Sequence, residues 1–387
     1  MPRSITTNVH PAVFKWLRES AGWSIEDVSK KLKSSVETVK AIESGVRDPT
    51  LNQLRTLSSA YKRPIAAFFL PQPQKEKPLP KDFRMLQNRT NVFDKKTLLV
   101  LRNARRLQKI YGELSSNIHD QTKPAIENAT ISDSPSEYAE RYRSIFDLTE
   151  EKQRRFRDSR SLFNHLRDQM GEMNILVFQE SLPVEDARGF ALPDDIPNVI
   201  VLNSKDSIEA RNFSIMHEFA HLLLGETAID LPDITISNQS RIESWCNDFA
   251  SAFLLPEELG RAQFESNRDS LTETGSLKKL SRRFKISKGM LLFNMRKQGF
   301  ISKPEYEAVL ARYAQPISNV GEEKEEEKDS RTGGIPQDIS CLSKVGNKFV
   351  SLVANNYDRN HITYTDALNY LSIKSRNFDK VLAKAKQ

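Results

Sequence analysis

The residues best placed to do chemistry stand in the segment 214–225, SIMHEFAHLLLG, which contains the pattern HExxH. Residues four apart share a face of an α-helix, so His217 and His221 can present two imidazoles to one metal ion. Glu218 lies beside them, where it could take a proton from a metal-bound water. The surrounding side chains are apolar and predict a buried helix over residues 206–224. Such a helix needs a reason to carry three polar groups, because unpaired polar groups in a core are costly.

A candidate third ligand lies on the next predicted helix, over residues 241–253, whose first turns read RIESWCNDFA. Catalytic zinc usually takes three protein ligands and leaves its fourth position to water. Glu243 can supply a carboxylate oxygen, and Asn247, one turn further on, can orient a ligand histidine. Cys246 leaves two interpretations open, a thiolate ligand or a small buried residue, and we favour the second because free cysteine is usually buried. The two helices predict one Zn²⁺ per chain, and the alternative is a chance HExxH in a chain with only 6 histidines.

These two segments resemble the ImmA/IrrE family of zinc metallopeptidases, which follow the thermolysin-like gluzincin plan. The family pattern runs roughly R-x-F-[ST]-x-x-H-E-x-x-H-x-x-x-G and then E-x-x-A-N-x-F-A. The chain reads RNFSIMHEFAHLLLG and then ESWCNDFASAFLLP at the matching positions. Cys246 stands where the family usually has alanine, and Asn247 stands where thermolysin-like enzymes usually have aspartate. The resemblance covers about residues 150–303.

The resemblance implies a site and an activity. His217, His221 and Glu243 would be the zinc ligands, and Glu218 would be the catalytic base of a cytoplasmic endopeptidase. Zinc would activate the attacking water and polarise the scissile carbonyl, while Glu218 would carry the water proton to the leaving amine. One of the predicted strands, GFAL or NVIVLNS, could pair with an extended substrate. By the same resemblance the substrate would be a regulatory protein such as a repressor or an antitoxin.

Residues 1–70 predict a small helical domain of a different kind. Ser24 is a capping residue with Asp27 three positions on, which signals a helix start, and a third helix is expected over residues 36–43. The segment IESGVRDPT resembles the I-E-x-G-x-R-x-P signature of Cro/C1-type helix-turn-helix domains. Gly45 suits the left-handed end of such a helix. The resemblance implies a five-helix domain.

This domain is basic, with eleven Lys and Arg against six Asp and Glu, which is compatible with binding to double-stranded DNA. In docked helix-turn-helix domains the first residues of the third helix face the major groove. Those positions are Ser35, Glu37, Thr38 and Lys40. Glu37 would repel phosphate unless it reads a cytosine amino group. The alternative is a domain that binds a protein, for example another helix-turn-helix repressor.

Composition constrains the class of protein. The 387 residues exceed one typical domain, and 38% hydrophobic residues are enough to build a core. Two cysteines exclude a disulfide-rich scaffold, and the net charge of +7 permits a nucleic-acid partner without requiring one. No apolar run approaches the roughly 18 residues of a membrane span, and no secretory signal is evident. We expect a cytoplasmic protein without membrane contact.

Composition also divides the chain into five expected segments. They are a helix-turn-helix domain over 1–70, a linker and helical connector over 71–149, the metallopeptidase core over 150–315 with a helix-turn-helix-like module at 277–302, a charged linker over 316–336 and a helical segment over 337–387. The proline-rich PQPQKEKPLP and the charged GEEKEEEKDSRTGG carry the linker predictions. Helix packing or formation of a homodimer is the expected role of the last segment.

The predicted fold is multidomain and mainly helical. The core is expected to be α+β, with the HExxH helix beside a small mixed sheet. Three short β-branched runs predict its strands, namely NILVFQES, ARGFAL and NVIVLNS. Further helices are expected at 95–116, 137–146, 150–171 and 276–297.

Together these features predict a zinc endopeptidase coupled to a DNA-binding module. The alternative is a helix-turn-helix transcriptional regulator in which the peptidase fold is a sensor or a protein-interaction scaffold without turnover. The intact HExxH motif and Glu243 favour the enzyme, because a scaffold has no need of the base.

Overall fold

The computed structural model describes residues 6–75, 94–119, 126–183, 187–225, 236–314 and 336–385. These residues form two compact units, of which the first holds residues 6–75 and 94–105 and the second holds nearly all of the others. The predicted charged linker falls outside the described residues except for Pro336, and so do the last five residues of PQPQKEKPLP. Among the described helices, none is both long enough and apolar enough to cross a membrane.

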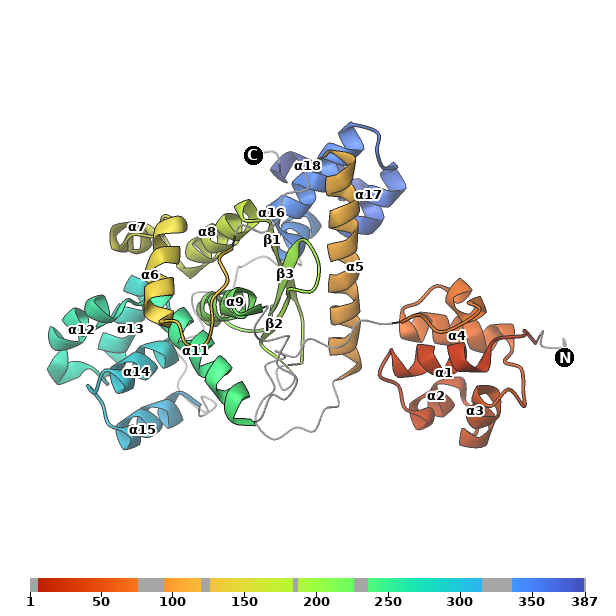
Figure 1. Cartoon of the computed structure of the whole chain (residues 1–387), viewed down its shortest axis with the longest axis horizontal. Helices are drawn as coiled ribbons and strands as arrows, with labels where there is room; N and C mark the ends of the chain where they lie inside the picture. The colour runs from red at the N-terminus through yellow and green to blue at the C-terminus, as the bar shows by residue number, and fades with distance from the viewer. Residues whose placement is uncertain are drawn as a thin grey trace. The chain divides into compact units, whose positions relative to one another are not determined.

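The first unit is a small helical bundle around one apolar core (Figure 1). Its elements are α1 (Pro11–Glu19), α2 (Ile25–Leu32), α3 (Val36–Glu43), α4 (Leu51–Tyr61) and the 3-10 helix η1 (Ile65–Phe69). The prediction of five helices is met by four α-helices and one 3-10 helix. Ser24 and Thr50 start α2 and α4 with reciprocal capping boxes.

A buried ion pair closes this bundle. Arg18 of α1 donates to both carboxylate oxygens of Glu43 at the end of α3, at 2.6 and 3.1 Å. Gly45 follows with a φ of 76°, the left-handed ending that the sequence predicts. The first turns of α5 (Lys95–Asn117) also belong to this unit, since Lys95 binds Asp27 at 2.8 Å.

The second unit contains a three-stranded mixed sheet (Figure 1). Its strands are β1 (Ile175–Glu180), β2 (Gly189–Leu192) and β3 (Asn198–Asn203). All three predicted strands are therefore confirmed. β3 lies in the middle, parallel to β1 and antiparallel to β2. Both faces of the sheet are covered, because nearly every strand residue is buried whichever face it points to.

Helices provide this cover. α9 (Ile208–Leu223) packs against β2 and β3, and α8 (Ser159–Glu172) packs against β1 and α9. α5 runs past the opposite side of the sheet (Figure 1), where Gln108 donates to the carbonyl of Pro197 at 2.8 Å. α9 in turn packs against α11 (Ile236–Leu254), which carries the candidate third ligand.

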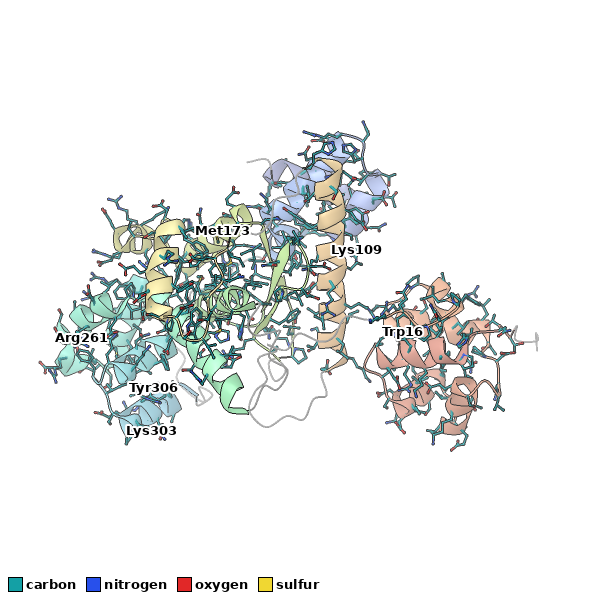
Figure 2. The ribbon with its side chains drawn as sticks, in the orientation of Figure 1. Trp16, Lys109, Met173, Arg261, Lys303 and Tyr306 are labelled. Carbon is teal, nitrogen blue, oxygen red and sulfur yellow. The ribbon has the colours of Figure 1, made fainter. Side chains whose placement is uncertain are left out.

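The remaining helices surround α9 and α11 on the side away from α5 (Figure 1). They are α6 (Pro135–Ile145), α7 (Glu150–Arg155), α12 (Glu257–Glu265), the 3-10 helix η2 (Arg268–Ser270), α13 (Thr274–Phe284), α14 (Lys288–Lys297) and α15 (Lys303–Ala314). Arg261 of α12 and Lys303 of α15 extend outward from these helices (Figure 2).

The prediction of one long helix over 150–171 is wrong, because the helix is interrupted between α7 and α8. Asp158 has an extended backbone, and its carboxylate accepts the Ser161 N–H at 2.8 Å to start a new helix. The helical pattern over 276–297 is also divided into two helices, because Lys285 ends α13 in the left-handed conformation, with a φ of 60°.

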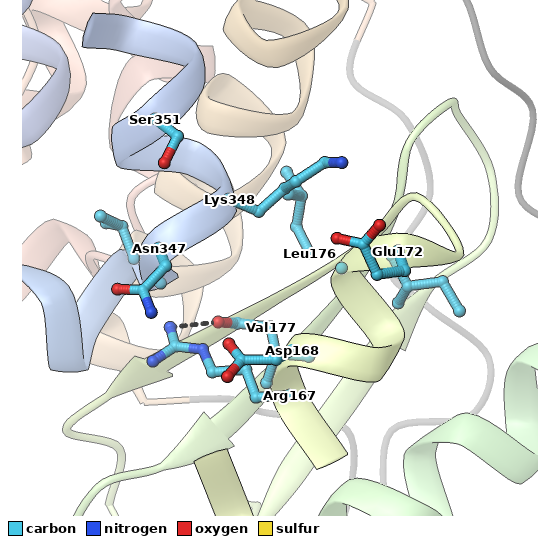
Figure 3. Close-up of a pocket in the computed structure, with 12 residues that line it drawn as sticks. Arg167, Asp168, Glu172, Leu176, Val177, Asn347, Lys348 and Ser351 are labelled. Carbon is cyan, nitrogen blue, oxygen red and sulfur yellow. Dashed lines mark hydrogen bonds between the residues drawn. The ribbon is translucent and has the colours of Figure 1, made fainter. Parts of the chain in front are cut away.

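A helical C-terminal segment completes the unit with α16 (Gln337–Asp358), α17 (Tyr364–Leu371), the 3-10 helix η3 (Ser375–Asn377) and α18 (Phe378–Ala385). α16 packs against β1 and is broken at Gly346, where φ is 83°. Arg167 of α8 donates to the last turn before the break, at the carbonyls of Leu342, Ser343 and Lys344. The same guanidinium donates to Val177 of β1 and lines a pocket of about 330 Å³ (Figure 3). The C-terminal segment is thereby attached to both β1 and α8.

Candidate metal centre

The middle of α9 is fixed by its surroundings. Ser207 caps the helix by accepting the Ala210 N–H at 3.2 Å. Apolar side chains then bury the helix in the main core, and they include Ile215, Met216, Phe219, Ala220, Leu222 and Leu223. Between them His217, Glu218 and His221 are almost completely inaccessible, at 0%, 0% and 1% exposure. The predicted buried helix with three polar groups is therefore present.

The two histidines and Glu243 converge on one point. The Nε2 atoms of His217 and His221 lie 3.1 Å apart. Glu243 projects from α11 and places Oε2 3.3 Å from His217 Nε2 and Oε1 3.4 Å from His221 Nε2. Their ligand atoms lie within 4.8 Å of one another, which makes these side chains a group able to hold a metal ion. Among the described residues, no other group of His, Cys, Asp and Glu meets this condition.

This set of donors suits zinc. Two imidazole nitrogens and one carboxylate oxygen, with a fourth position left to water, are the ligands of known catalytic zinc sites. Two Nε2 atoms at 3.1 Å cannot both turn lone pairs toward each other without a proton or a cation between them. The geometry therefore fits a bound cation.

The electrostatics of the site also favour positive charge. Burial alone would raise the pKa of Glu243, but hydrogen bonds from His217 and His221 hold that pKa well below its ordinary range. Burial would lower the pKa of His221, but Cys246 and Glu243 beside it raise that pKa well above its usual value. The carboxylate thus stays charged, and the ring nitrogens face a position that attracts a proton or a metal ion.

Glu218 lies between the ligand set and the sheet. A Cβ built on Gly189 of β2 would come 3.1 Å from Glu218 Oε1, so the carboxylate rests against that strand. Its charge also contributes to the raised pKa of His221. Phe213, one turn before His217, places its ring centroid 6.1 Å from that of the imidazole. The site thus combines a candidate base, three candidate ligands and an apolar neighbour.

Comparison with protein-family models identifies one domain within each unit. The model of the IrrE N-terminal-like peptidase domain matches residues 170–296, from the end of α8 through both metal-site helices to α14. A helix-turn-helix model matches residues 14–68. The chain joins a helix-turn-helix domain to an IrrE N-terminal-like peptidase domain. A search of curated proteins found no significant match to the chain.

In the IrrE N-terminal-like domain, Cys246 and Asn247 follow Glu243 on α11 by three and four positions. Cys246 is completely buried beside His221, where burial raises the pKa of its thiol and a hydrogen bond with the His221 imidazole opposes that rise. The interpretation of Cys246 as a small buried residue stays a prediction. Asn247 Oδ1 is buried without a hydrogen-bond partner among the described residues. Asn247 Oδ1 therefore accepts no hydrogen bond from a ligand histidine in this structure, and a supporting role for Asn247 stays a prediction.

Buried polar contacts attach the α13–α14 pair to the two metal-site helices. Asn212 of α9 donates to the carbonyl of Lys285, in the turn between α13 and α14, at 3.1 Å. Ser251 of α11 donates to Asn294 of α14 at 2.9 Å. α14 also buries most of its apolar side chains in the main core, so its hydrogen bond to Ser251 joins α11 to a firmly packed helix.

The helix-turn-helix domain places its four candidate DNA-contacting residues at the start of α3. Ser35 accepts the Thr38 N–H at 3.2 Å, so its side chain caps the helix. Thr38 is half-buried, whereas Glu37 and Lys40 are exposed. Hydrogen bonds from its own backbone and from Ser35 lower the pKa of Glu37, which keeps the carboxylate charged. α3 therefore exposes one acidic side chain, Glu37, and one basic side chain, Lys40, near its start.

Proposed function

We propose that the peptidase domain is an active zinc endopeptidase that cleaves a regulatory protein of the repressor or antitoxin type. The observation that carries the proposal is the convergence of His217, His221 and Glu243, with Glu218 buried beside them. Three buried ionisable side chains and a partly buried fourth, Glu243, are costly unless they bind or react. A scaffold without turnover would gain nothing from retaining them.

Each residue has a proposed role in the reaction. His217, His221 and Glu243 would hold one zinc ion, which when bound would polarise the scissile carbonyl and lower the pKa of the attacking water. Glu218 would accept the proton of that water and pass it to the amine leaving group. Asn247, one turn after Glu243 on α11, would help to orient a ligand histidine.

β2 is the strand along which we expect the substrate to lie. β2 is an edge of the described sheet, whereas β3 lies in the middle, so the choice between GFAL and NVIVLNS falls on GFAL. The Asn203 N–H donates to the Arg188 carbonyl at 2.8 Å, and strand alternation then turns the backbone groups of Gly189 and Ala191 away from β3. A peptide pairing with those groups would pass beside Glu218.

The helix-turn-helix domain gives the chain a DNA-binding module, and we propose that Ser35, Glu37, Thr38 and Lys40 face the DNA. The exposed positions of Glu37 and Lys40 support this assignment. DNA and a regulatory protein substrate would meet in the cytoplasm, where we place the chain.

Cleavage of regulatory proteins encoded beside this gene tests the proposal. Zinc-loaded protein and Glu218→Gln are incubated with each regulator, and products are identified by mass spectrometry. Wild type should cleave one regulator, while Glu218→Gln should retain zinc and lose cleavage. Glu209→Gln, an exchange of the same kind in the first turn of α9, should cleave like wild type. Cleavage at the wild-type rate by Glu218→Gln would remove Glu218 from the mechanism, and zinc-loaded wild type that cleaves no regulator would favour the scaffold.

A further inference from the structure

Gly189 is a glycine that the backbone does not require. It is the first residue of β2, and its φ lies outside the left-handed region that favours glycine. Glycine in a strand weakens the strand, because it loses more conformational freedom on folding and has no side chain to pack. A glycine at such a position often marks the close approach of another group.

The group that approaches Gly189 is the side chain of Glu218. A Cβ on Gly189 would lie 3.1 Å from Glu218 Oε1 and 3.2 Å from Glu218 Cγ. It would also lie 2.9 Å from the carbonyl oxygen of Val201 on the paired strand. All three separations are tighter than ordinary van der Waals contacts, and Glu218 is completely buried, so it has little room to give way.

We propose that Gly189 is a positioning residue for Glu218. Because Gly189 has no side chain, it leaves the space in which this carboxylate lies, directed at the His217, His221 and Glu243 cluster. The proposal deepens the proposed function and rests on it. The same residue turns its backbone N–H and C=O toward the edge where the substrate would pair. Gly189 therefore sets the separation between the docked peptide and the base, because its backbone would bind the peptide and its missing side chain leaves room for Glu218.

Gly189→Ala tests the proposal through catalysis. The added methyl group should displace the carboxylate by a few tenths of an ångström. Misplacement of a full 1 Å can cost roughly 100-fold in rate, so the smaller shift should cost less. We expect kcat on the best-cleaved member of a quenched-fluorescence peptide library to fall about 3- to 10-fold, with KM and zinc content unchanged. Gly275→Ala is the matched control, because a Cβ there meets nothing within 4 Å, and it should cleave like wild type. An undiminished kcat in Gly189→Ala would overturn the proposal.

A double-mutant comparison tests the contact without any need for catalysis. Urea midpoints are measured for wild type, Gly189→Ala, Glu218→Ala and the double variant, all without metal. Glu218→Ala removes the atoms that clash, so Gly189→Ala should lower the midpoint less in that background than in wild type. If Gly189→Ala alone does not fold, a folded double variant gives the same support. An equal fall of the urea midpoint in both backgrounds, or a double variant that does not fold, would overturn the proposal. Either result would mean that the added methyl group clashes with the Val201 carbonyl rather than with Glu218.

The two tests separate this inference from the proposed function. If wild type binds zinc and cleaves nothing, the endopeptidase proposal fails, while the urea midpoints still report whether Gly189 and Glu218 are coupled. If wild type cleaves and Gly189→Ala cleaves equally well, only the positioning role fails.

Discussion

Replacement of Gln153 by alanine should weaken the attachment of α13 to the peptidase core. Gln153 belongs to the short helix α7 and is only 1% exposed. Its Nε2 donates to the carbonyls of Leu254 and Phe284, at 2.8 and 2.9 Å. Its Oε1 accepts from Arg143 of α6 at 3.0 Å. One amide therefore links α6 to the last residues of α11 and α13, and α11 carries Glu243.

The magnitude follows from what the alanine leaves behind. The carbonyls of Leu254 and Phe284 are final-turn groups without a partner inside their own helices. A buried carbonyl left without a partner costs about 1–3 kcal/mol, and the lost bond to Arg143 adds about 1 kcal/mol. We expect Gln153→Ala to cost about 4 kcal/mol of local stability, which corresponds to roughly 1,000-fold in an opening equilibrium.

Hydrogen-exchange mass spectrometry measures this loss directly, because it reports on α13 separately from the rest of the chain. Amides of α13 and of the last turn of α11 should exchange several hundred-fold faster in Gln153→Ala. Gln169→Ala, which truncates a half-buried glutamine of α8, should leave them unchanged. Acceleration of less than about tenfold in Gln153→Ala would refute the reasoning, since it would correspond to less than about 1.4 kcal/mol.

Three further predictions concern the ion pair, the metal and the DNA. Glu43→Gln removes the buried carboxylate partner of Arg18 and leaves only the exposed Glu19, at 3.2 Å. The helix-turn-helix domain should then lose about 3 kcal/mol in urea unfolding followed by tryptophan fluorescence, and an unchanged midpoint would contradict this. The raised pKa of His221 means that zinc must displace a proton, so apparent zinc affinity in chelator competition should still rise above pH 6.5, by about tenfold per pH unit while the ring keeps its proton. A flat profile between pH 6.5 and 8 would show that the ring is already neutral. Lys40→Ala should weaken binding to the operator and reduce its salt slope by about one, measured by fluorescence anisotropy, and an unchanged slope would place Lys40 away from the phosphates.

The parts that the sequence predicts well carry local signals. HExxH places two histidines and Glu218 on one helix face without any knowledge of the rest of the fold. Ser24 and Gly45 mark helix ends through their own chemistry, and both features are present. The strands are short β-branched runs, and each lies where its pattern predicts.

The parts that the sequence does not predict depend on partners far along the chain. Gln153 looks like an ordinary helical residue, yet its carbonyl partners lie 101 and 131 positions away. Which strand forms the edge beside the metal site follows from pairing order, which no single strand encodes. Gly189 did carry a usable signal, because a glycine within a strand pattern suggests a close approach, but nothing in the sequence identifies Glu218 as the group that approaches.

Metal stoichiometry tests the central claim most directly. Zinc per chain is measured by mass spectrometry on purified wild type and on His217→Ala, His221→Ala, Glu243→Ala and Cys246→Ala. We predict about one zinc in wild type and in Cys246→Ala, and its loss from the other three variants. Wild type without zinc after incubation with the metal, or zinc retained in Glu243→Ala and lost in Cys246→Ala, would contradict the site described here.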